Sequence, residues 1–203
     1  MFKTTLLAAA VSVLAISSAA AQDFPSVTEL PANIVEPNAA TPLSGADAIA
    51  VHETVTRVYL AEDARNGVAL KQLVTDDFVQ DHAIYGRLEG PDAFKSFVLD
   101  NPLAFDRYRH MAMNIVTKAT GDNEAEAVSY ILVLNVHPTD ESQAAGLPNI
   151  LAHGVVRDRL EKEDGQWRIA HRIYDQFAVS ASVVPDQETR RNAARTVSAN
   201  DAN

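Results

Sequence analysis

The chain has 203 residues, of which 47% are apolar and 22% are charged, and it contains no cysteine. A chain of this length and apolar content is expected to build one core, so wholesale disorder is excluded. The absence of cysteine excludes disulfides, thiolate nucleophiles, iron–sulfur clusters and cysteine zinc sites. The formal charge of −10 argues against nucleic acid as a partner, because binding to phosphate requires a cationic surface.

The first 21 residues have the pattern of a secretory signal peptide. Lys3 precedes an apolar stretch from Leu6 to Ile16, and small residues stand at Ala19 and Ala21, as signal peptidase requires. This stretch is too short to span a bilayer, and no later segment approaches about 18 consecutive apolar residues, so no membrane span is expected. The sequence therefore predicts a periplasmic or secreted protein that loses residues 1–21.

The remaining chain divides into three segments. Residues 22–43 are rich in proline and alanine without a clear period, which predicts an extended leader. Residues 44–180 carry the punctuated apolar pattern of a folded domain. Residues 181–203 become polar and rich in alanine and asparagine, which predicts a flexible tail.

The first part of the domain has helical patterns. Ser44, followed three residues later by Asp47, resembles a capping box, and apolar residues then recur at helical spacing as far as Tyr59. Asn66-Gly67 is expected to supply a left-handed stop, after which residues 68–74 predict a shorter helix. Residues 78–84 predict a strand, and Gly90-Pro91 opens a third helix that ends before Pro102.

The second part of the domain has the pattern of long strands. Four runs are rich in β-branched and aromatic residues, namely 105–119, 125–136, 150–161 and 167–179. Turn sequences at 121–123 and 163–165 join neighbouring runs as hairpins. Helices followed by an antiparallel meander predict an α+β fold with a concave pocket between the sheet and the helices.

Three sequence blocks carry a resemblance to a known family. They are LKQLVTDD (70–77), RYRHMAMN (107–114) and HGVVRDRLEKEDGQWRIAHR (153–172). From about Ala46 to Phe177 the chain resembles the SnoaL-like, scytalone-dehydratase-like branch of the nuclear-transport-factor-two-like superfamily. The resemblance implies a cone-shaped, curved antiparallel sheet wrapped around three N-terminal helices. Members of this superfamily include enzymes as well as binding and assembly modules, so the fold does not fix the function.

The same resemblance implies three catalytic positions. The dehydratases have an aspartate seven residues before a leucine of the next helix, and Asp63 precedes Leu70 by that interval. A histidine opens their strand after the third helix, where His110 stands here. A second histidine lies fourteen residues before the tryptophan of the last hairpin, which matches His153 and Trp167.

These residue types suit acid–base chemistry. An imidazole titrates near neutral pH, and a carboxylate beside it fixes its tautomer and stabilises its cation. We expect Asp63 and His110 to form a dyad that acts as general base and acid. His153 would be a second acid or an oxyanion partner.

Three further residues are expected to contact the substrate. Tyr59 lies one helical turn before Asp63, so its hydroxyl can point into the same pocket. His82 stands where the family has a tyrosine at the end of the first strand. Tyr130 lies on the strand expected over 125–136.

No metal or cofactor is expected. His52-Glu53 is not followed by the second histidine of a zincin motif, and there is no glycine-rich loop for a nucleotide. A metal site assembled in space from His82, His110 and His153 is the alternative.

Two functions follow from these residues. The first is a cofactor-independent lyase or isomerase that acts on a small carbonyl or aromatic compound. The second is a non-catalytic small-molecule-binding or assembly module. The expected partners are a small-molecule ligand and, through the outer face of the sheet, a second copy in a homodimer or other homo-oligomer.

Overall fold

The computed structural model describes residues 42–101, 107–136 and 148–194. The elements are α2 (Gly45–Asp63), α3 (Gly67–Leu73), β1 (Val74–His82), β2 (Gly86–Glu89), α4 (Pro91–Asp100), β3 (Tyr108–Gly121), β4 (Glu124–Asn135), β5 (Asn149–Glu163), β6 (Gln166–Val179) and α6 (Gln187–Ala193). The predicted signal peptide and nearly all of the predicted leader lie outside the described residues.

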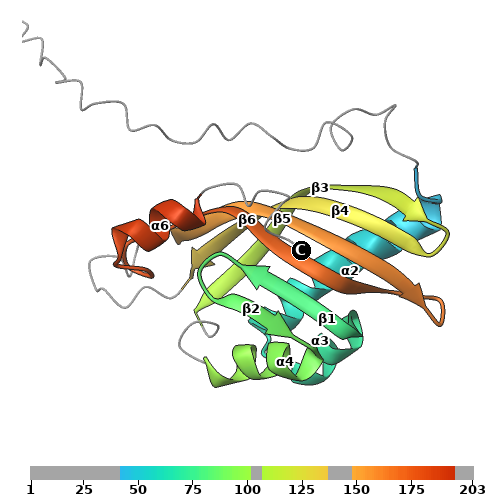
Figure 1. Cartoon of the computed structure of the whole chain (residues 1–203), viewed down its shortest axis with the longest axis horizontal. Helices are drawn as coiled ribbons and strands as arrows, with labels where there is room; N and C mark the ends of the chain where they lie inside the picture. The colour runs from blue at the N-terminus through green and yellow to red at the C-terminus, as the bar shows by residue number, and fades with distance from the viewer. Residues whose placement is uncertain (1–41, 102–106, 137–147, 195–203) are drawn as a thin grey trace, which may run out of the picture.

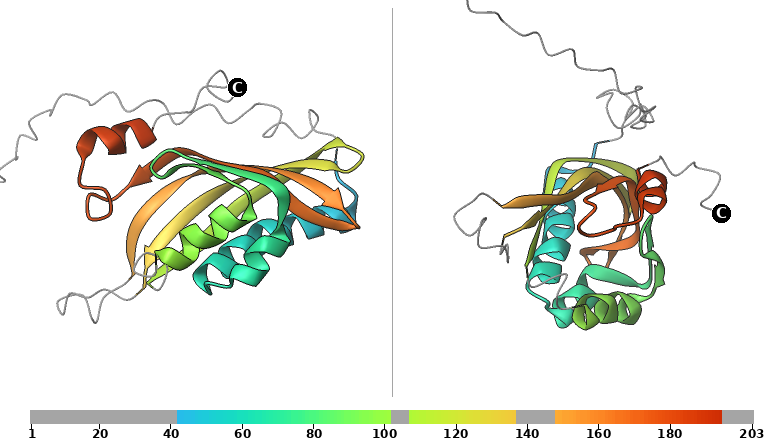
Figure 2. Two further views of the ribbon diagram at one scale, coloured as in Figure 1. Left: turned by 60° about the horizontal axis from the view of Figure 1, so that its bottom comes forward. Right: turned by 90° about the vertical axis from the view of Figure 1, so that its left-hand side faces the viewer.

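The strands form one curved sheet in the order β2-β1-β6-β5-β4-β3. The sheet arches over α2, and α3 and α4 lie below its β1–β2 end (Figures 1 and 2). This is the predicted α+β cone with three N-terminal helices. It differs in one respect, because β1 pairs with β6 in parallel while all the other neighbouring strands are antiparallel.

Local signals set the ends of α2. The Ser44 side chain accepts a hydrogen bond from the Asp47 backbone N–H at 3.1 Å, as the capping pattern predicts. The left-handed residue that follows the helix is Arg65 (φ 51°), so the expectation of a stop at Asn66-Gly67 was wrong. Asn66 instead begins α3, where its side chain caps the Ala69 N–H.

The buried face of α2 packs against the inner face of the sheet. Its apolar stripe includes Val51, Val55 and Val58, which are at most 1% exposed. Glu62 continues this stripe one turn after Val58 and is 4% exposed. Helical periodicity therefore places a carboxyl group in the interior.

A β-bulge in β6 shapes the opposite wall. Between the pairs Val155–Asp175 and His153–Ala178, β6 contains one residue more than β5, and Gln176 has a φ of 49°. In a regular strand, residues three apart face opposite sides of the sheet. The extra residue resets this alternation, so both Tyr174 and Phe177 line the interior.

Residues 195–203 of the predicted flexible tail lie outside the described residues, whereas its described part ends at residue 194. The described part contains α6, whose first turn is capped by Asp186 through a hydrogen bond from the Thr189 N–H. A helix of only seven residues gives too short a periodic pattern to be predicted from the sequence. Among the described residues, no helix combines the length and apolar character needed to cross a bilayer.

Candidate functional site

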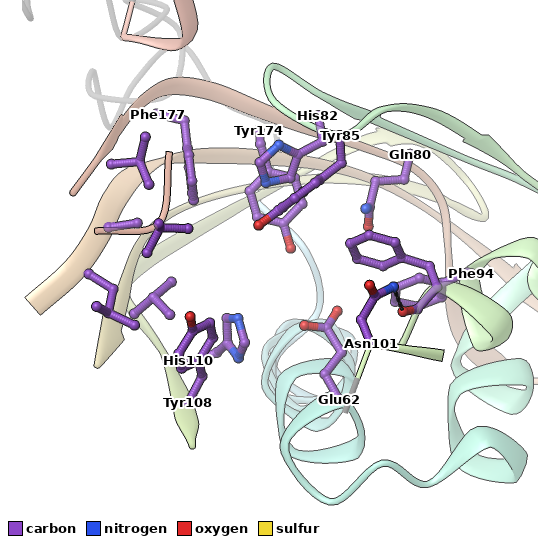
Figure 3. Close-up of a pocket in the computed structure, with 16 residues that line it drawn as sticks. Glu62, Gln80, His82, Tyr85, Phe94, Asn101, Tyr108, His110, Tyr174 and Phe177 are labelled. Atoms are coloured by element: carbon purple, nitrogen blue, oxygen red, sulfur yellow. Dashed lines mark hydrogen bonds between the residues drawn. The ribbon is translucent and has the colours of Figure 1, made fainter. Parts of the chain in front are cut away.

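A cavity of about 180 Å³ lies between the sheet and the helices (Figure 3). Its wall is mostly apolar and aromatic, and includes Phe94, Phe97, Val133, Leu151, Phe177 and Val183. Polar side chains project into it from α2, β3 and β6, namely Glu62, His110 and Tyr174. An apolar cavity with a few convergent polar groups is typical of a small-molecule site.

Asp63 and His110 form a pair at this cavity. The Asp63 carboxylate accepts the His110 backbone N–H at 3.3 and 3.1 Å, and its Oδ1 lies 2.7 Å from the ring Nδ1. Both side chains are nearly buried, at 9% and 11% exposure. In the neutral tautomer that a carboxylate acceptor selects, Nδ1 carries the proton and Nε2 is the nitrogen that can accept one. The last residue of α2 therefore fixes the ring of a histidine on β3.

Glu62 lines the cavity and is not among the residues predicted for the site. Its carboxyl group projects toward the middle of the cavity (Figure 3). Burial raises the pKa of this carboxyl; His110 and Arg172 oppose the rise, while Asp63 and Asp158 add to it. The signal that could have found it is its position four residues after Val58, on the apolar stripe of the helix.

Arg172 lies beneath the cavity without lining it. It is completely buried and binds Asp158 through two hydrogen bonds of 2.7 and 2.9 Å. Its Nη1 lies 3.8 Å from Glu62 Oε1, beyond hydrogen-bond distance. Arg172 therefore forms a hydrogen-bonded ion pair with Asp158 and a longer ion pair, without a hydrogen bond, with Glu62.

Tyr59 has a different place from the one predicted. It is 1% exposed and is not part of the cavity lining. Its ring stacks on the His110 ring, with the two centroids 5.8 Å apart. The guanidinium of Arg172, on β6, lies 4.5 Å from the centroid of the Tyr59 ring. The apolar face of α2 carries Tyr59 into the core, where it packs against His110 and does not line the cavity.

His82 lies on the cavity wall, at the end of β1. Its ring packs against Tyr85, Tyr174 and Phe177, with centroids 4.5 to 4.7 Å away. Burial lowers its pKa to about 3, and the nearby His110 contributes to this shift. His82 is therefore neutral near neutral pH, and its Nδ1 accepts the Ile84 N–H.

His153 and Tyr130 are not brought to the cavity. Their strand neighbours Ala152 and Ile131 are buried, whereas His153 is exposed and Tyr130 is 39% exposed. Successive side chains of a strand point to opposite faces, so both residues lie on the outer face of the sheet. The structure therefore does not bring His153 together with Asp63 and His110, and it places Tyr130 away from the cavity.

The separation of His153 also removes the proposed metal site of three histidines. Within the described part of the chain, no group of three or more histidine, aspartate or glutamate side chains could hold a metal ion. His82 and His110 remain as the two histidines of the cavity.

Comparison with known families agrees with this geometry. A family model described as a SnoaL-like domain matches residues 46–173. The chain belongs to the SnoaL-like domain family. This confirms the SnoaL-like part of the resemblance found in the sequence. Comparison with curated proteins gave no match.

Several solved structures share the SnoaL-like fold. A scytalone dehydratase candidate from Novosphingobium aromaticivorans has a TM-score of 0.54 and 21% identity, covering 66% of this chain and 85% of its own. A variant of Rv3472, a Mycobacterium tuberculosis protein of unknown function, has a TM-score of 0.58 and 22% identity, covering 71% and 83%. The protein LinA has a TM-score of 0.54 and 18% identity, covering 67% and 90%. At these identities the likeness shows the fold.

Proposed function

We propose that this SnoaL-like protein is a cofactor-independent lyase or isomerase that acts on a small carbonyl or aromatic compound. The observation that carries the proposal is the Asp63–His110 pair on the wall of an apolar cavity, with 2.7 Å between Oδ1 and Nδ1. The scytalone dehydratase candidate among the similar structures supports the same class of reaction.

The proposed chemistry starts with proton removal from carbon. His110 Nε2 takes a proton from a carbon beside a carbonyl group, and Asp63 stabilises the imidazolium that forms. The apolar wall strengthens this interaction because it excludes water. Return of the proton to a different carbon gives an isomer, and its delivery to a β-hydroxyl group releases water.

A test of the base does not require the natural substrate. The probe is 5-nitrobenzisoxazole, in which a base removes the C3 proton while the N–O bond breaks, giving a coloured cyanophenolate. We expect the wild-type protein to open the probe faster than buffer does. Because a positioned base contributes roughly 10²–10⁴ in rate, His110→Gln should lower this rate about 100-fold or more.

The chain offers a matched control for this experiment. His171 also pairs with an aspartate, Asp81, at 2.8 Å, but the pair lies outside the cavity. His171→Gln should leave the probe rate unchanged. Equal rates for the wild-type and His110→Gln proteins would remove the base assignment. Binding of the probe without opening it would favour the second function, a ligand-binding module.

The natural ligand can be sought directly. Native mass spectrometry of the purified protein would show a small molecule that remains bound in the cavity. We expect a mass that corresponds to a compound of one or two rings, since an apolar cavity of about 150 Å³ accommodates benzene.

We also propose that the protein is exported to the periplasm or secreted. The proposal rests on Lys3, the apolar stretch 6–16 and the small residues before Gln22. Expression in a bacterial host followed by N-terminal sequencing tests it. A mature form that begins at Gln22 outside the cytoplasm is expected, and retention of Met1 in the cytoplasm would contradict it.

A further inference from the structure

The end of α2 presents two consecutive carboxyl groups that point in different directions. Adjacent residues of a helix are separated by about 100° around its axis. Asp63 therefore reaches His110, while Glu62 projects into the cavity (Figure 3). The pair with His110 uses only the carboxyl group of Asp63. The buried carboxyl group of Glu62 in the cavity is left without an assigned role.

Burial and neighbouring acids disfavour the ionised form of Glu62, whereas His110 and Arg172 act in the opposite direction. Glu62 is 4% exposed, and water therefore does little to stabilise a negative charge on it. Arg172 forms an ion pair with Glu62 at 3.8 Å but no hydrogen bond to it, because two of its nitrogens bind the oxygens of Asp158. Asp63 and Asp158 place further negative charge nearby, and burial raises the pKa of Glu62.

A second oxygen donor projects into the same space. The Tyr174 hydroxyl points from β6 into the cavity, toward the side from which Glu62 projects (Figure 3). Burial raises the pKa of Tyr174 above its usual value, so the hydroxyl keeps its proton. A carboxylic acid and a phenol that face one apolar space can both donate hydrogen bonds to one oxygen atom.

We infer that Glu62 is the acid of this site and protonates the substrate oxygen, assisted by a hydrogen bond from Tyr174. The inference rests on the proposed function and replaces the acid role that the sequence analysis gave to His153. It defines the substrate class as compounds of one or two rings whose carbonyl oxygen becomes an enol or phenol oxygen.

The step balances without a cofactor. His110 Nε2 takes the proton from the carbon beside the carbonyl group, and the C–H electron pair forms a carbon–carbon double bond. The carbonyl π pair moves to oxygen, which receives the Glu62 proton. The products of this half-reaction are an enol, an imidazolium at His110 and a carboxylate at Glu62. Return of the enol proton to Glu62, with transfer of the His110 proton to another carbon or to a leaving hydroxyl group, restores both residues.

The protonation of Glu62 can be measured without a substrate. In an infrared difference spectrum between the wild-type protein and Glu62→Gln at pH 7, a carbonyl band of a protonated carboxylic acid should disappear in the variant. The control is Glu53→Gln, on the exposed face of the same helix, where Glu53 pairs with Arg57. A loss of carboxylate bands alone would show that Glu62 is ionised, which overturns the inference.

The hydrogen bond between Glu62 and a ligand oxygen can be measured with a matched pair of ligands, while the infrared band shows whether Glu62 has the proton to donate. 2-Naphthol carries a hydroxyl group where 2-methylnaphthalene carries a methyl group, and both are followed by their fluorescence. Glu62→Leu should weaken 2-naphthol about tenfold, which corresponds to a loss of about 1.4 kcal/mol. The same change should leave 2-methylnaphthalene binding unchanged or stronger, because it makes the cavity more apolar.

The outcomes separate this inference from the proposed function. Equal changes for both ligands, or no binding of 2-naphthol to the wild-type protein, would overturn the role of Glu62. His110→Gln should keep the preference for 2-naphthol, since the base does not bind the oxygen. Failure of the benzisoxazole reaction together with a selective loss in Glu62→Leu would leave Glu62 as a binding donor and remove the catalysis.

Discussion

His82 shows how burial, with a smaller contribution from His110, sets the charge of one residue. A histidine in the unfolded chain titrates near pH 6.5, whereas burial lowers the pKa of His82 to about 3 in the folded protein. Between these values the unfolded chain binds a proton that the folded protein excludes. The contribution of His82 to stability is therefore fully present above pH 6.5 and is lost as the pH falls toward 3.

Replacing His82 with phenylalanine should reduce this acid sensitivity. The ring would still pack against Tyr174 and Phe177 but would not titrate. Between pH 7.5 and pH 5 the wild-type protein should lose roughly 2 kcal/mol more unfolding free energy than His82→Phe. Urea unfolding at both pH values measures this difference. His52→Phe, at an exposed position of α2, should keep the full pH dependence, and the same dependence in His82→Phe would contradict the assignment.

The sequence identifies some residues of the site and misses others for physical reasons. The spacing from Asp63 to Leu70 and the strand position of His110 point to the pair that the structure brings together. The sequence does not predict where the His153 side chain points, because that depends on which face of β5 turns inward. Pairing with strands distant in the sequence decides which face this is. Glu62 was missed although the helical stripe passes through it, because a single charged residue is usually assigned to the surface.

At the scale of elements, the bulge in β6 depends on a close approach of two strands. A Cβ atom at Gly154 of β5 would lie 2.8 Å from Phe177 Cδ2 and 3.0 Å from the Asp175 carbonyl oxygen. Because the second of these is backbone, it cannot move aside without disturbing the strand. Glycine at position 154 therefore lets β5 pass the bulge that directs Phe177 into the cavity.

Gly154→Ala should destabilise the protein by about 1–3 kcal/mol, the usual cost of overpacking. Chemical denaturation measures this loss. The variant should also bind 2-methylnaphthalene more weakly, because Phe177 is displaced from the cavity wall. Gly45→Ala is the control, since no atom lies within 4 Å of a Cβ there. A variant Gly154→Ala with unchanged stability and binding would show that the bulge tolerates the methyl group.

Local signals predict most of the elements, and the remaining ones depend on distant contacts. The start of α2 is identified by the Ser44 cap, and the start of α4 by Gly90-Pro91. The β5–β6 hairpin is identified by the turn at 163–165. The short strand β2 carries no pattern of its own and exists because β1 lies beside it. The parallel pairing of β1 with β6 joins segments about ninety residues apart, so no local pattern predicts it.

At the scale of the whole molecule, one carboxylate links the first helix to the last hairpin. Asp47 in the first turn of α2 accepts hydrogen bonds from Lys162 Nζ at 2.7 Å and Trp167 Nε1 at 2.8 Å. These two donors lie on either side of the β5–β6 turn. Together with Ser44 they lower the pKa of Asp47 to about 2. These hydrogen bonds hold the start of α2 against the sheet. Because the helix is one continuous element, they also help to position its far end, which carries Glu62 and Asp63.

Asp47→Asn should lower the thermal midpoint at pH 7, because the amide keeps the shape of the group but loses its charge. The folded pKa of Asp47 lies below the usual 3.8, so its stabilising effect is present above pH 3.8 and disappears as the pH falls through about 2. Melting curves of the two proteins should therefore converge between pH 4 and pH 2. Asp122→Asn, in the exposed β3–β4 turn, should match the wild-type protein at every pH. A difference between Asp47→Asn and wild type that is as large at pH 2 as at pH 7 would mean that shape, and not charge, holds the helix to the hairpin.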